Sequence, residues 1–162
     1  MRLWHKWLIP VLPRQQLISQ YRENNAIMKA IAENNAPNHI LVNKVMDYPI
    51  IHFATYHKFV LDELRNRNYK TRADAVERFK DYYKTVTERN FEEDALGFFN
   101  PKDNHTADDL FMTDYEDLQW HNRRYYIQCL YNLQEKYDCG GISKDEWELI
   151  VKDANMRGID ID

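Results

Sequence analysis

The sequence has few of the residues that form the turns of a many-stranded sheet. It contains 4 glycines and 5 prolines in 162 residues, and these two residue types supply most tight turns. Its hydrophobic fraction of 44% and charged fraction of 30% are ordinary for a globular protein. A chain of this length can bury a core as one domain, or as one domain with a helical addition. We therefore expect an all-α fold.

Cysteine and long apolar runs are also lacking. Cys129 and Cys139 are too few for a disulfide framework, and their spacing matches no zinc-binding pattern. No apolar stretch approaches the roughly 18 residues that indicate a membrane span. Residues 1–12 include basic side chains and too short an apolar run for a signal peptide. These absences predict a cytoplasmic protein.

The net charge of −4 hides an uneven distribution along the chain. Residues 1–90 hold 15 Lys and Arg against 9 Asp and Glu, a balance of +6, whereas residues 91–162 hold 7 against 17, a balance of −10. A basic half and an acidic half fit a protein that presents only one face to DNA. The alternative is that these charges merely solvate helices.

The N-terminal half is expected to form an arm followed by helices. Pro10 and Pro13 predict that residues 1–13 form an extended arm, because proline disrupts a helix that runs through it. Apolar residues at three- and four-residue spacing predict a first helix over 14–34. Residues 39–47 form a short apolar stretch of uncertain type. Pro49 is expected to open a second helix ending near Arg67.

Capping patterns indicate the later helices. Thr71, with Asp74, is expected to cap a third helix that ends near Arg89. The acidic residues 90–105 are interpreted as a linker. Two further helix starts are expected, and these are marked by Thr106 with Asp109 and by Thr113 with Glu116.

The second of these starts is expected to begin a long helix that reaches Asp138, where Gly140-Gly141 ends it. Ser143 and Glu146 form a capping box for a last helix reaching Met156. The predicted organisation is a helical core with its arm over residues 1–90, and an acidic helical extension packed on it over 91–162. This extension ends in a helix–Gly-Gly–helix hairpin.

The arm and the first helix carry the most unusual pattern, MRLWHKWLIPVLPRQQLISQYRENNAI. This segment resembles the start of the pyrimidine dimer DNA glycosylase family, typified by the phage endonuclease V type of enzyme. The residues that match its first helix without a gap are Gln15, Leu17, Tyr21, Arg22 and Glu23. A weaker similarity continues through Tyr56-His57 and ends at Tyr69-Lys70, so the resemblance covers roughly residues 1–72.

The resemblance implies a compact helical fold whose arm threads between helices to reach the active site. It also implies a reaction that cuts the glycosidic bond of a damaged pyrimidine and then nicks the strand by β-elimination. An N-terminal α-amine ordinarily has a pKa of about 8, far below that of a lysine, so part of it is a free base at neutral pH. By resemblance, the α-amine of Met1 is the nucleophile, and Glu23 stabilises positive charge and moves protons.

The resemblance implies a set of further site residues. Phosphate contacts are expected from Arg2, Arg14 and Arg22. Gln15 and Gln16 are expected to bind an extruded base or its partner, beside Trp4 and His5. Residues expected to line the site are Tyr21, Tyr56 and His57. Each also has an ordinary structural interpretation, because helix-start glutamines often only cap, and buried aromatic residues and histidines most often serve the core.

The sequence departs from the family pattern in ways that bear on its chemistry. Arg2 is too bulky for ordinary removal of the initiator methionine, so Met1 itself would supply the amine. Gln16 stands where the family has a histidine, Ala26 stands where it has an arginine, and its aromatic C-terminal tail is absent. We therefore expect a substrate preference that differs from the classical one, toward a modified base rather than a dimer.

Metal sites receive little support from the sequence. His52 and His57 lie five residues apart, on different helix faces, and no HExxH pattern occurs. The segment ending in Glu146 imitates a calcium loop, but Tyr137 and Cys139 would be poor oxygen ligands. We therefore expect that the protein needs no cofactor, and a metal-dependent nuclease is the weakest of the alternative functions.

The sequence predicts a DNA glycosylase with AP-lyase activity that acts on double-stranded DNA containing a damaged or modified pyrimidine. It is expected in the cytoplasm of a bacterial cell or a phage-infected host. The main alternative is a non-catalytic DNA-binding or protein-interaction module that keeps the same fold. In either case the acidic residues 91–162 are candidates for contacting a protein partner or a second copy of the chain.

Overall fold

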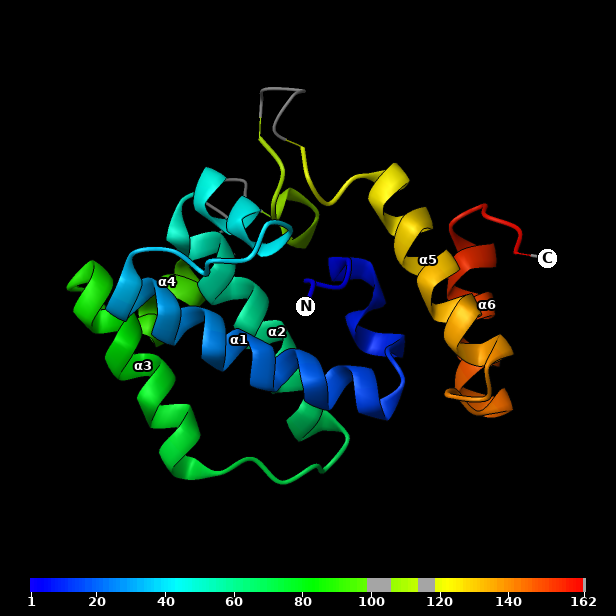
Figure 1. The fold of residues 1–162 in the computed structure, drawn as a ribbon, viewed down its shortest axis with the longest axis horizontal. Coiled ribbons are helices and arrows are strands. Elements are labelled where there is room, and N and C mark those ends of the chain that lie inside the picture. Colours follow the sequence, from blue (N-terminus) through cyan, green and yellow to red (C-terminus); the bar gives the residue numbers. More distant parts are fainter. Residues whose placement is uncertain (99–105, 114–118, 162) are drawn as a thin grey trace.

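The computed structural model describes residues 1–98, 106–113 and 119–161, and every regular element in these ranges is helical (Figure 1). The all-α prediction is confirmed. The elements are η1 (Lys6–Val11), α1 (Arg14–Asn34), η2 (Val42–Asp47), α2 (Ile50–Asn66), α3 (Ala73–Thr87), α4 (Phe91–Gly97), η4 (Ala107–Asp109), α5 (Arg123–Asp138) and α6 (Lys144–Met156).

The arm is not extended throughout, which corrects the prediction for residues 1–13. Lys6–Val11 form a 3₁₀ helix with Pro10 inside it. The φ angle that the proline ring imposes is also the φ angle of a 3₁₀ helix, so Pro10 fits within this short element. The turn begins with the Leu8 N–H donating to the His5 carbonyl at 2.9 Å. The two prolines therefore exclude an α-helix here but not a 3₁₀ helix.

Helix α1 has the predicted bounds. It follows Pro13 and ends where Asn35 adopts a left-handed conformation, with φ 64°, and donates its N–H to the Ile31 carbonyl. Its first free amide is satisfied from a distant element, because the Arg14 N–H donates to Glu146 Oε1 at 3.0 Å. One carboxylate thereby ties the start of α1 to the start of α6.

Helix α2 follows Pro49 as predicted, but α3 does not begin as expected. Arg72 is the N-cap residue and no side chain caps the helix, so the prediction that Thr71 caps it is wrong. The Asp74 carboxylate instead binds the guanidinium of Arg72, with N–O distances of 3.1 and 3.0 Å. This ion pair replaces the expected capping box.

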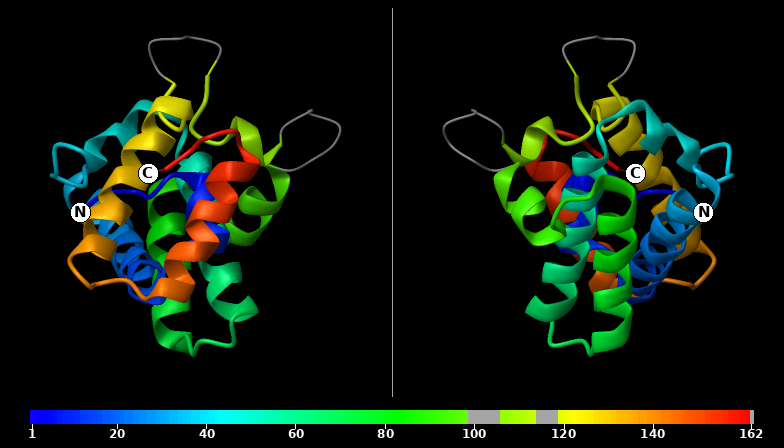
Figure 2. Two further views of the ribbon diagram at one scale, coloured as in Figure 1. Left: turned by 90° about the vertical axis from the view of Figure 1, so that its right-hand side faces the viewer. Right: turned by 90° about the vertical axis from the view of Figure 1, so that its left-hand side faces the viewer.

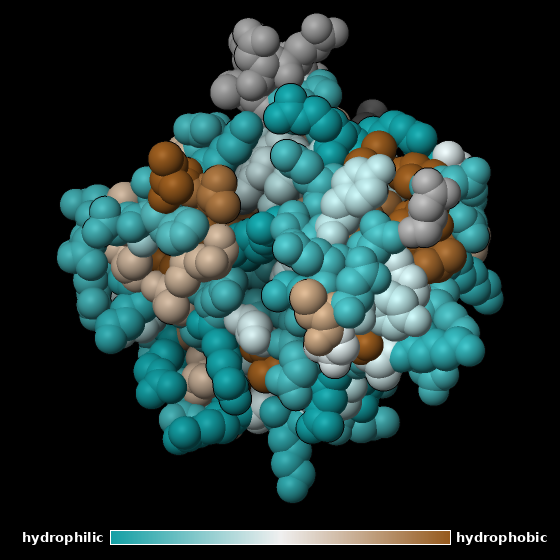
Figure 3. Space-filling view, turned by 45° about the vertical axis from the view of Figure 1, so that its right-hand side comes forward, coloured by the Kyte–Doolittle hydropathy of each residue, from teal (hydrophilic) through white to brown (hydrophobic). Residues whose placement is uncertain are grey.

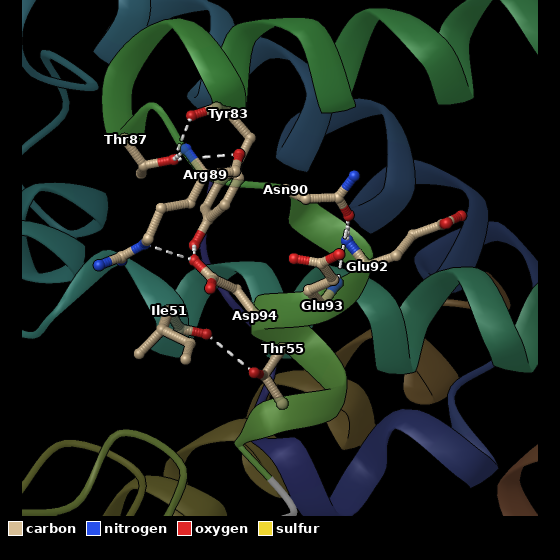
Figure 4. Close-up of polar contacts among 9 residues, drawn as sticks. All are labelled: Ile51, Thr55, Tyr83, Thr87, Arg89, Asn90, Glu92, Glu93 and Asp94. Carbon is tan, nitrogen blue, oxygen red and sulfur yellow. Dashed lines mark hydrogen bonds and ion pairs between the residues drawn. The ribbon is translucent and has the colours of Figure 1, made fainter.

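The linker predicted over 90–105 is wrong for its first part, which forms α4; residues 99–105 lie outside the described residues. Figure 4 shows why this acidic segment folds. The Asn90 side chain accepts hydrogen bonds from the N–H groups of Glu92 and Glu93. Acidic residues in the first turn interact favourably with the helix dipole and so stabilise the helix. Asp94 accepts hydrogen bonds from Tyr83 and Arg89, which fix α4 to α3.

The long helix predicted from Thr113 is also wrong at its start. Thr106 and Asp109 do form a capping box, but it opens only the short turn η4. Thr113 is not helical, Glu116 lies outside the described residues, and α5 begins at Arg123 after an Asn122 cap. The buried side chains of Trp120 and His121 explain the difference, because the chain before α5 is drawn into the core.

The C-terminal hairpin forms as predicted. Gly140 ends the turn after α5 with φ 80°, a conformation that favours glycine. The Ser143–Glu146 capping box opens α6, which ends at Met156. Helices α5 and α6 pack on each other, and α6 also packs on η1. Figure 2, left, shows this pair in front of the N-terminal arm.

The arm thus lies between two groups of helices, with α1 and α2 on one side and α5 and α6 on the other (Figure 1). Its apolar residues are buried in the core, as Leu3, Leu8, Ile9 and Leu12 show. The face drawn in Figure 3 is largely hydrophilic, with small and separate hydrophobic areas. Among the described residues, no helix is long and apolar enough to span a membrane.

Three buried histidines make the fold sensitive to acid. Burial lowers the pKa of His5 to about 3 and that of His57 to about 3, and it holds the pKa of His121 well below its usual range. The unfolded chain binds protons at these side chains from about pH 6.5 downward. The folded state resists them, so its stability falls as the pH drops from about 6.5 toward 3.

We expect the free energy of unfolding, measured with urea between pH 7 and pH 4, to fall by several kcal/mol. Each histidine contributes at most about 1.4 kcal/mol per pH unit. His57→Phe keeps a ring stacked on Phe79 and removes one titrating group, so it should flatten this dependence by up to that amount. An unchanged slope in the variant would contradict the assignment.

Candidate active site

The N-terminal arm is held by side chains that bind its backbone. The Trp4 N–H donates to Gln20 Oε1 at 2.9 Å, and the Tyr56 hydroxyl donates to the Trp4 carbonyl at 2.7 Å. The Tyr125 hydroxyl donates to the Leu3 carbonyl at 2.5 Å. Helices α1, α2 and α5 each supply one of these bonds, so all three fix the position of residues 3 and 4.

The rest of the arm is fixed in the same way. Arg67, at the end of α2, donates to the Leu12 carbonyl at 2.7 Å and the Pro10 carbonyl at 3.1 Å. The Lys6 N–H donates to His121 Nδ1 at 2.9 Å, and the Lys6 ammonium donates to the carbonyls of Asp108 and Leu110. Burial lowers the pKa of Lys6 to about 8. These bonds hold residues 3–12 of the arm and leave Met1 and Arg2 at its open end.

Those first residues open into a pocket of about 560 Å³, which we call the candidate pocket. Three parts of the chain form its walls. The arm contributes Met1, Arg2 and Trp4, α1 contributes Gln16, Ser19 and Glu23, and α5 with the residue after it contributes Asn132, Glu135, Lys136 and Cys139.

The candidate pocket brings together five of the residues singled out from the sequence: Met1, Arg2, Trp4, Gln16 and Glu23. The side chains of α1 reach it because residues 16, 19 and 23 share one face of the helix, at three- and four-residue spacing. Met1 is 49% exposed, so its end of the chain is accessible. The Arg2 guanidinium lies 5.1 Å from the centre of the buried Trp4 ring, which holds it against the wall.

The pocket carries charges of both signs. The α-amine of Met1, Arg2 and Lys136 are formally positive, and Glu23 and Glu135 are formally negative. Glu23 takes part in none of the ion pairs formed among the described residues. Its carboxylate is therefore not neutralised by a fixed partner within the described residues. An amine and a carboxylate in one open pocket can together support nucleophilic attack and proton transfer.

Gln16 has an unsatisfied polar atom. Its Oε1 is buried and has no hydrogen-bond partner in the described part of the chain. A buried acceptor without a partner is costly, so such an atom commonly marks a place where a ligand or water completes the bond. Gln16 is thus equipped to accept a hydrogen bond from a molecule in the candidate pocket.

Arg22 and Tyr21 lie on the adjacent flank of α1, facing α3. There they line a groove of about 590 Å³, the basic groove, which is rich in cations. Its basic side chains are Arg22, Lys29, Lys70, Arg72 and Arg78, and no acidic residue lines it in the described part of the chain. Asp74 binds Arg72 and Arg78 at 3.0 and 3.7 Å and offsets part of this charge.

The remaining predicted site residues lie away from the candidate pocket. Arg14 is exposed at the start of α1 and stacks over Tyr69 at 5.3 Å, and Gln15 is exposed beside it. His5 is fully buried, and its ring lies 4.9 Å from that of His121. Tyr56 and His57 are buried in α2, where Tyr56 binds the arm and His57 stacks on Phe79 at 3.6 Å.

Sequence reasoning missed two groups of residues that matter here. Gln20 and Asn24 lie within the apolar stripe of α1 and are buried, with Gln20 Nε2 donating to Asn24 Oδ1 at 2.9 Å. Polar residues at apolar-stripe positions were the available signal. The wall formed by Asn132, Glu135 and Lys136 has no such signal, because only the tertiary fold brings α5 to the same pocket as α1.

The arm, helices and pocket define a helical protein that presents an α-amine and a carboxylate in one solvent-open site. Residues 1–77 match the family whose model is described as pyrimidine dimer DNA glycosylase, so the resemblance seen in the sequence is confirmed for that part of the chain. The match supports DNA glycosylase function in general. It ends within α3, so the α5 wall of the pocket lies beyond it. No curated protein and no solved structure matches the chain.

We expect Tyr56→Phe to lower the free energy of unfolding by about 1 kcal/mol or somewhat more, because it leaves the buried Trp4 carbonyl without its donor. Urea unfolding measures this directly. Tyr131→Phe is the matched control, since Tyr131 is 62% exposed and should lose almost nothing. Equal stability of the two variants would show that the bond to the arm contributes little.

Proposed function

We propose that this protein is a DNA glycosylase with AP-lyase activity that removes a damaged or modified pyrimidine through an imine formed with its own N-terminal amine. The observation that carries the proposal is the meeting of Met1 and Glu23 in one open pocket. The family match over residues 1–77 supports the general activity. The nucleophile, the lyase step and the substrate are our proposals.

The reaction follows from the chemistry of an amine and a carboxylate. The free amine of Met1 attacks the sugar C1′, the C1′–N bond breaks, and the base leaves with a proton. The sugar ring opens at O4′, which takes up a proton, and the amine loses its own to give an imine with C1′. Glu23 stabilises the positive charge that develops on the sugar and moves these protons.

Strand cleavage continues from the same intermediate. The imine acidifies C2′, Glu23 accepts the C2′ proton, a C2′=C3′ double bond forms, and the C3′–O3′ bond breaks, so that the downstream strand leaves with a 5′-phosphate. Water then hydrolyses the imine and frees the amine. Every step uses groups of the candidate pocket and water, so the proposed mechanism requires no organic cofactor or metal ion.

The charges around the pocket suit a nucleic acid. Arg2 and Lys136 line the pocket itself, and the basic groove lies on the adjacent flank of α1, with Arg22 on its rim. A strand whose target nucleotide enters the candidate pocket can place its neighbouring phosphates near these cations. The basic groove is lined only by residues of the basic half of the chain, so we place the DNA phosphates along it. The expected role of residues 91–162 in protein contacts or self-association stays a prediction.

Substrate choice is assigned to residues at the pocket wall. A volume of about 560 Å³ lies within the range that small-molecule and nucleotide sites occupy. Gln16, where the family has a histidine, offers an unsatisfied acceptor to a base N–H, and Asn132 on α5 provides a second amide. A pyrimidine with an N–H donor on its pairing edge fits this arrangement.

Glu23→Gln is expected to abolish nicking of a duplex that contains a thymine dimer or an abasic site, with a loss of at least about 100-fold. The amide cannot accept the C2′ proton, but it keeps the size of the side chain, so DNA affinity should change little. Gel assays of nicking and fluorescence anisotropy measure the two effects. Glu33→Gln is the control, because Glu33 is exposed at the far end of α1.

The nucleophile is tested by blocking it. Borohydride reduces an imine, so it should trap a covalent complex between the wild-type protein and an abasic duplex. A protein with two residues added before Met1 should lose this complex by at least about 100-fold, because the amine is displaced from the pocket. Undiminished trapping would assign the imine to a lysine instead, and Lys136 would be the first candidate.

A further inference from the structure

Two adjacent aliphatic side chains stand out on the loop between α1 and α2. Ile40 is 89% exposed, more than any other large hydrophobic residue among those described, and Leu41 is 55% exposed. Single exposed hydrophobic residues are common on protein surfaces and need no explanation. A consecutive pair is different, because two adjacent exposed aliphatic side chains form a contiguous apolar surface of the kind that marks an interaction site.

Hydrogen bonds order the turn that carries this pair, with both side chains pointing toward solvent. The His39 carbonyl accepts the N–H groups of Val42 and Asn43 at 3.0 and 2.8 Å, and the Asn43 side chain accepts the His39 N–H at 3.1 Å. Val42 is completely buried and anchors the turn in the core. Of the three consecutive apolar residues 40–42, Val42 therefore points into the core, whereas Ile40 and Leu41 point into solvent from an ordered turn.

The surroundings of the pair are basic and adjoin the candidate pocket. Ile40 and Leu41 line a second pocket of about 590 Å³, together with the cations Arg2, Lys44 and Arg124. Among the described residues its lining contains no acidic side chain, and it shares Arg2 and Asn132 with the candidate pocket. A small aliphatic pair beside cations suits stacked bases that are flanked by phosphates.

We propose that Ile40 and Leu41 form a wedge that enters the base stack of duplex DNA when the target nucleotide moves into the candidate pocket. The inference rests on the proposed function of that pocket. A base cannot be reached inside a duplex and must leave its stack, which opens a gap. Apolar side chains fill such a gap and keep the base steps apart. Arg2, Lys44 and Arg124 then hold the phosphates on either side of the distortion.

The wedge is tested first without catalysis. The probe is a duplex with a tetrahydrofuran abasic-site analogue, which cannot form an imine, and a neighbouring 2-aminopurine, whose fluorescence rises when it unstacks. The wild-type protein should raise this fluorescence several-fold at saturation. The double variant I40S/L41S should give less than a third of that rise and bind about tenfold more weakly. L149S is the control, because Leu149 is 56% exposed on α6 and should behave as wild type.

A second measurement separates the wedge from a structural defect. On a fully paired duplex with one thymine dimer, I40S/L41S should nick about tenfold more slowly than the wild type. On the same lesion inside an unpaired bubble, the loss should be less than twofold, because the stack is already open there. Equal losses on both substrates, or an unchanged fluorescence rise, would overturn the wedge. Circular dichroism and thermal unfolding confirm that the variant is folded.

The outcomes distinguish this inference from the proposed function. A wild-type protein that unstacks 2-aminopurine through Ile40 and Leu41, but traps no covalent complex, keeps the wedge and overturns the glycosylase. A protein that traps the complex, with the same fluorescence rise in I40S/L41S, keeps the glycosylase and overturns the wedge. Failure to bind either duplex overturns both. Loss of self-association in I40S/L41S would then assign the pair to a contact between copies of the chain.

Discussion

Burying the N-terminal arm means that its backbone polar groups lose water, and each of them must find another partner. The arm cannot satisfy them itself, because it forms neither a long helix nor a sheet. Side chains from three helices do so, with Gln20, Tyr56 and Tyr125 binding the backbone of residues 3 and 4. The position of the chain start, and with it the shape of the candidate pocket, depends on these bonds.

Local patterns predicted much of the fold, and the errors have physical causes. The bounds of α1 and the Ser143–Glu146 cap of α6 follow from residues close in sequence, so both could be read directly. Helix α4 was missed because an acidic segment with one glycine and one proline resembles a linker unless the Asn90 cap and the buried Phe91 and Ala95 are weighed. The start of α5 was misplaced because burial of Trp120 and His121 depends on packing against the arm.

The candidate site was predictable to the extent that it lies in one stretch of sequence. Met1, Glu23 and Gln16 could be grouped because the arm and α1 are neighbours in the chain and carry a family pattern. Lys136 and Asn132 could not, because more than a hundred residues separate them from the arm and no periodicity links the two. The acidic half of the chain therefore contributes to a site that its overall charge argues against.

The bond between Tyr125 and the Leu3 carbonyl joins residues 122 positions apart. During synthesis the arm leaves the ribosome first, but one of its partners is made only after three quarters of the chain. Until α5 arrives, the arm lacks a donor and the pocket lacks a wall. A nascent or C-terminally truncated chain thus carries Met1 and Glu23 without the α5 wall, so the candidate pocket is complete only when synthesis is nearly finished.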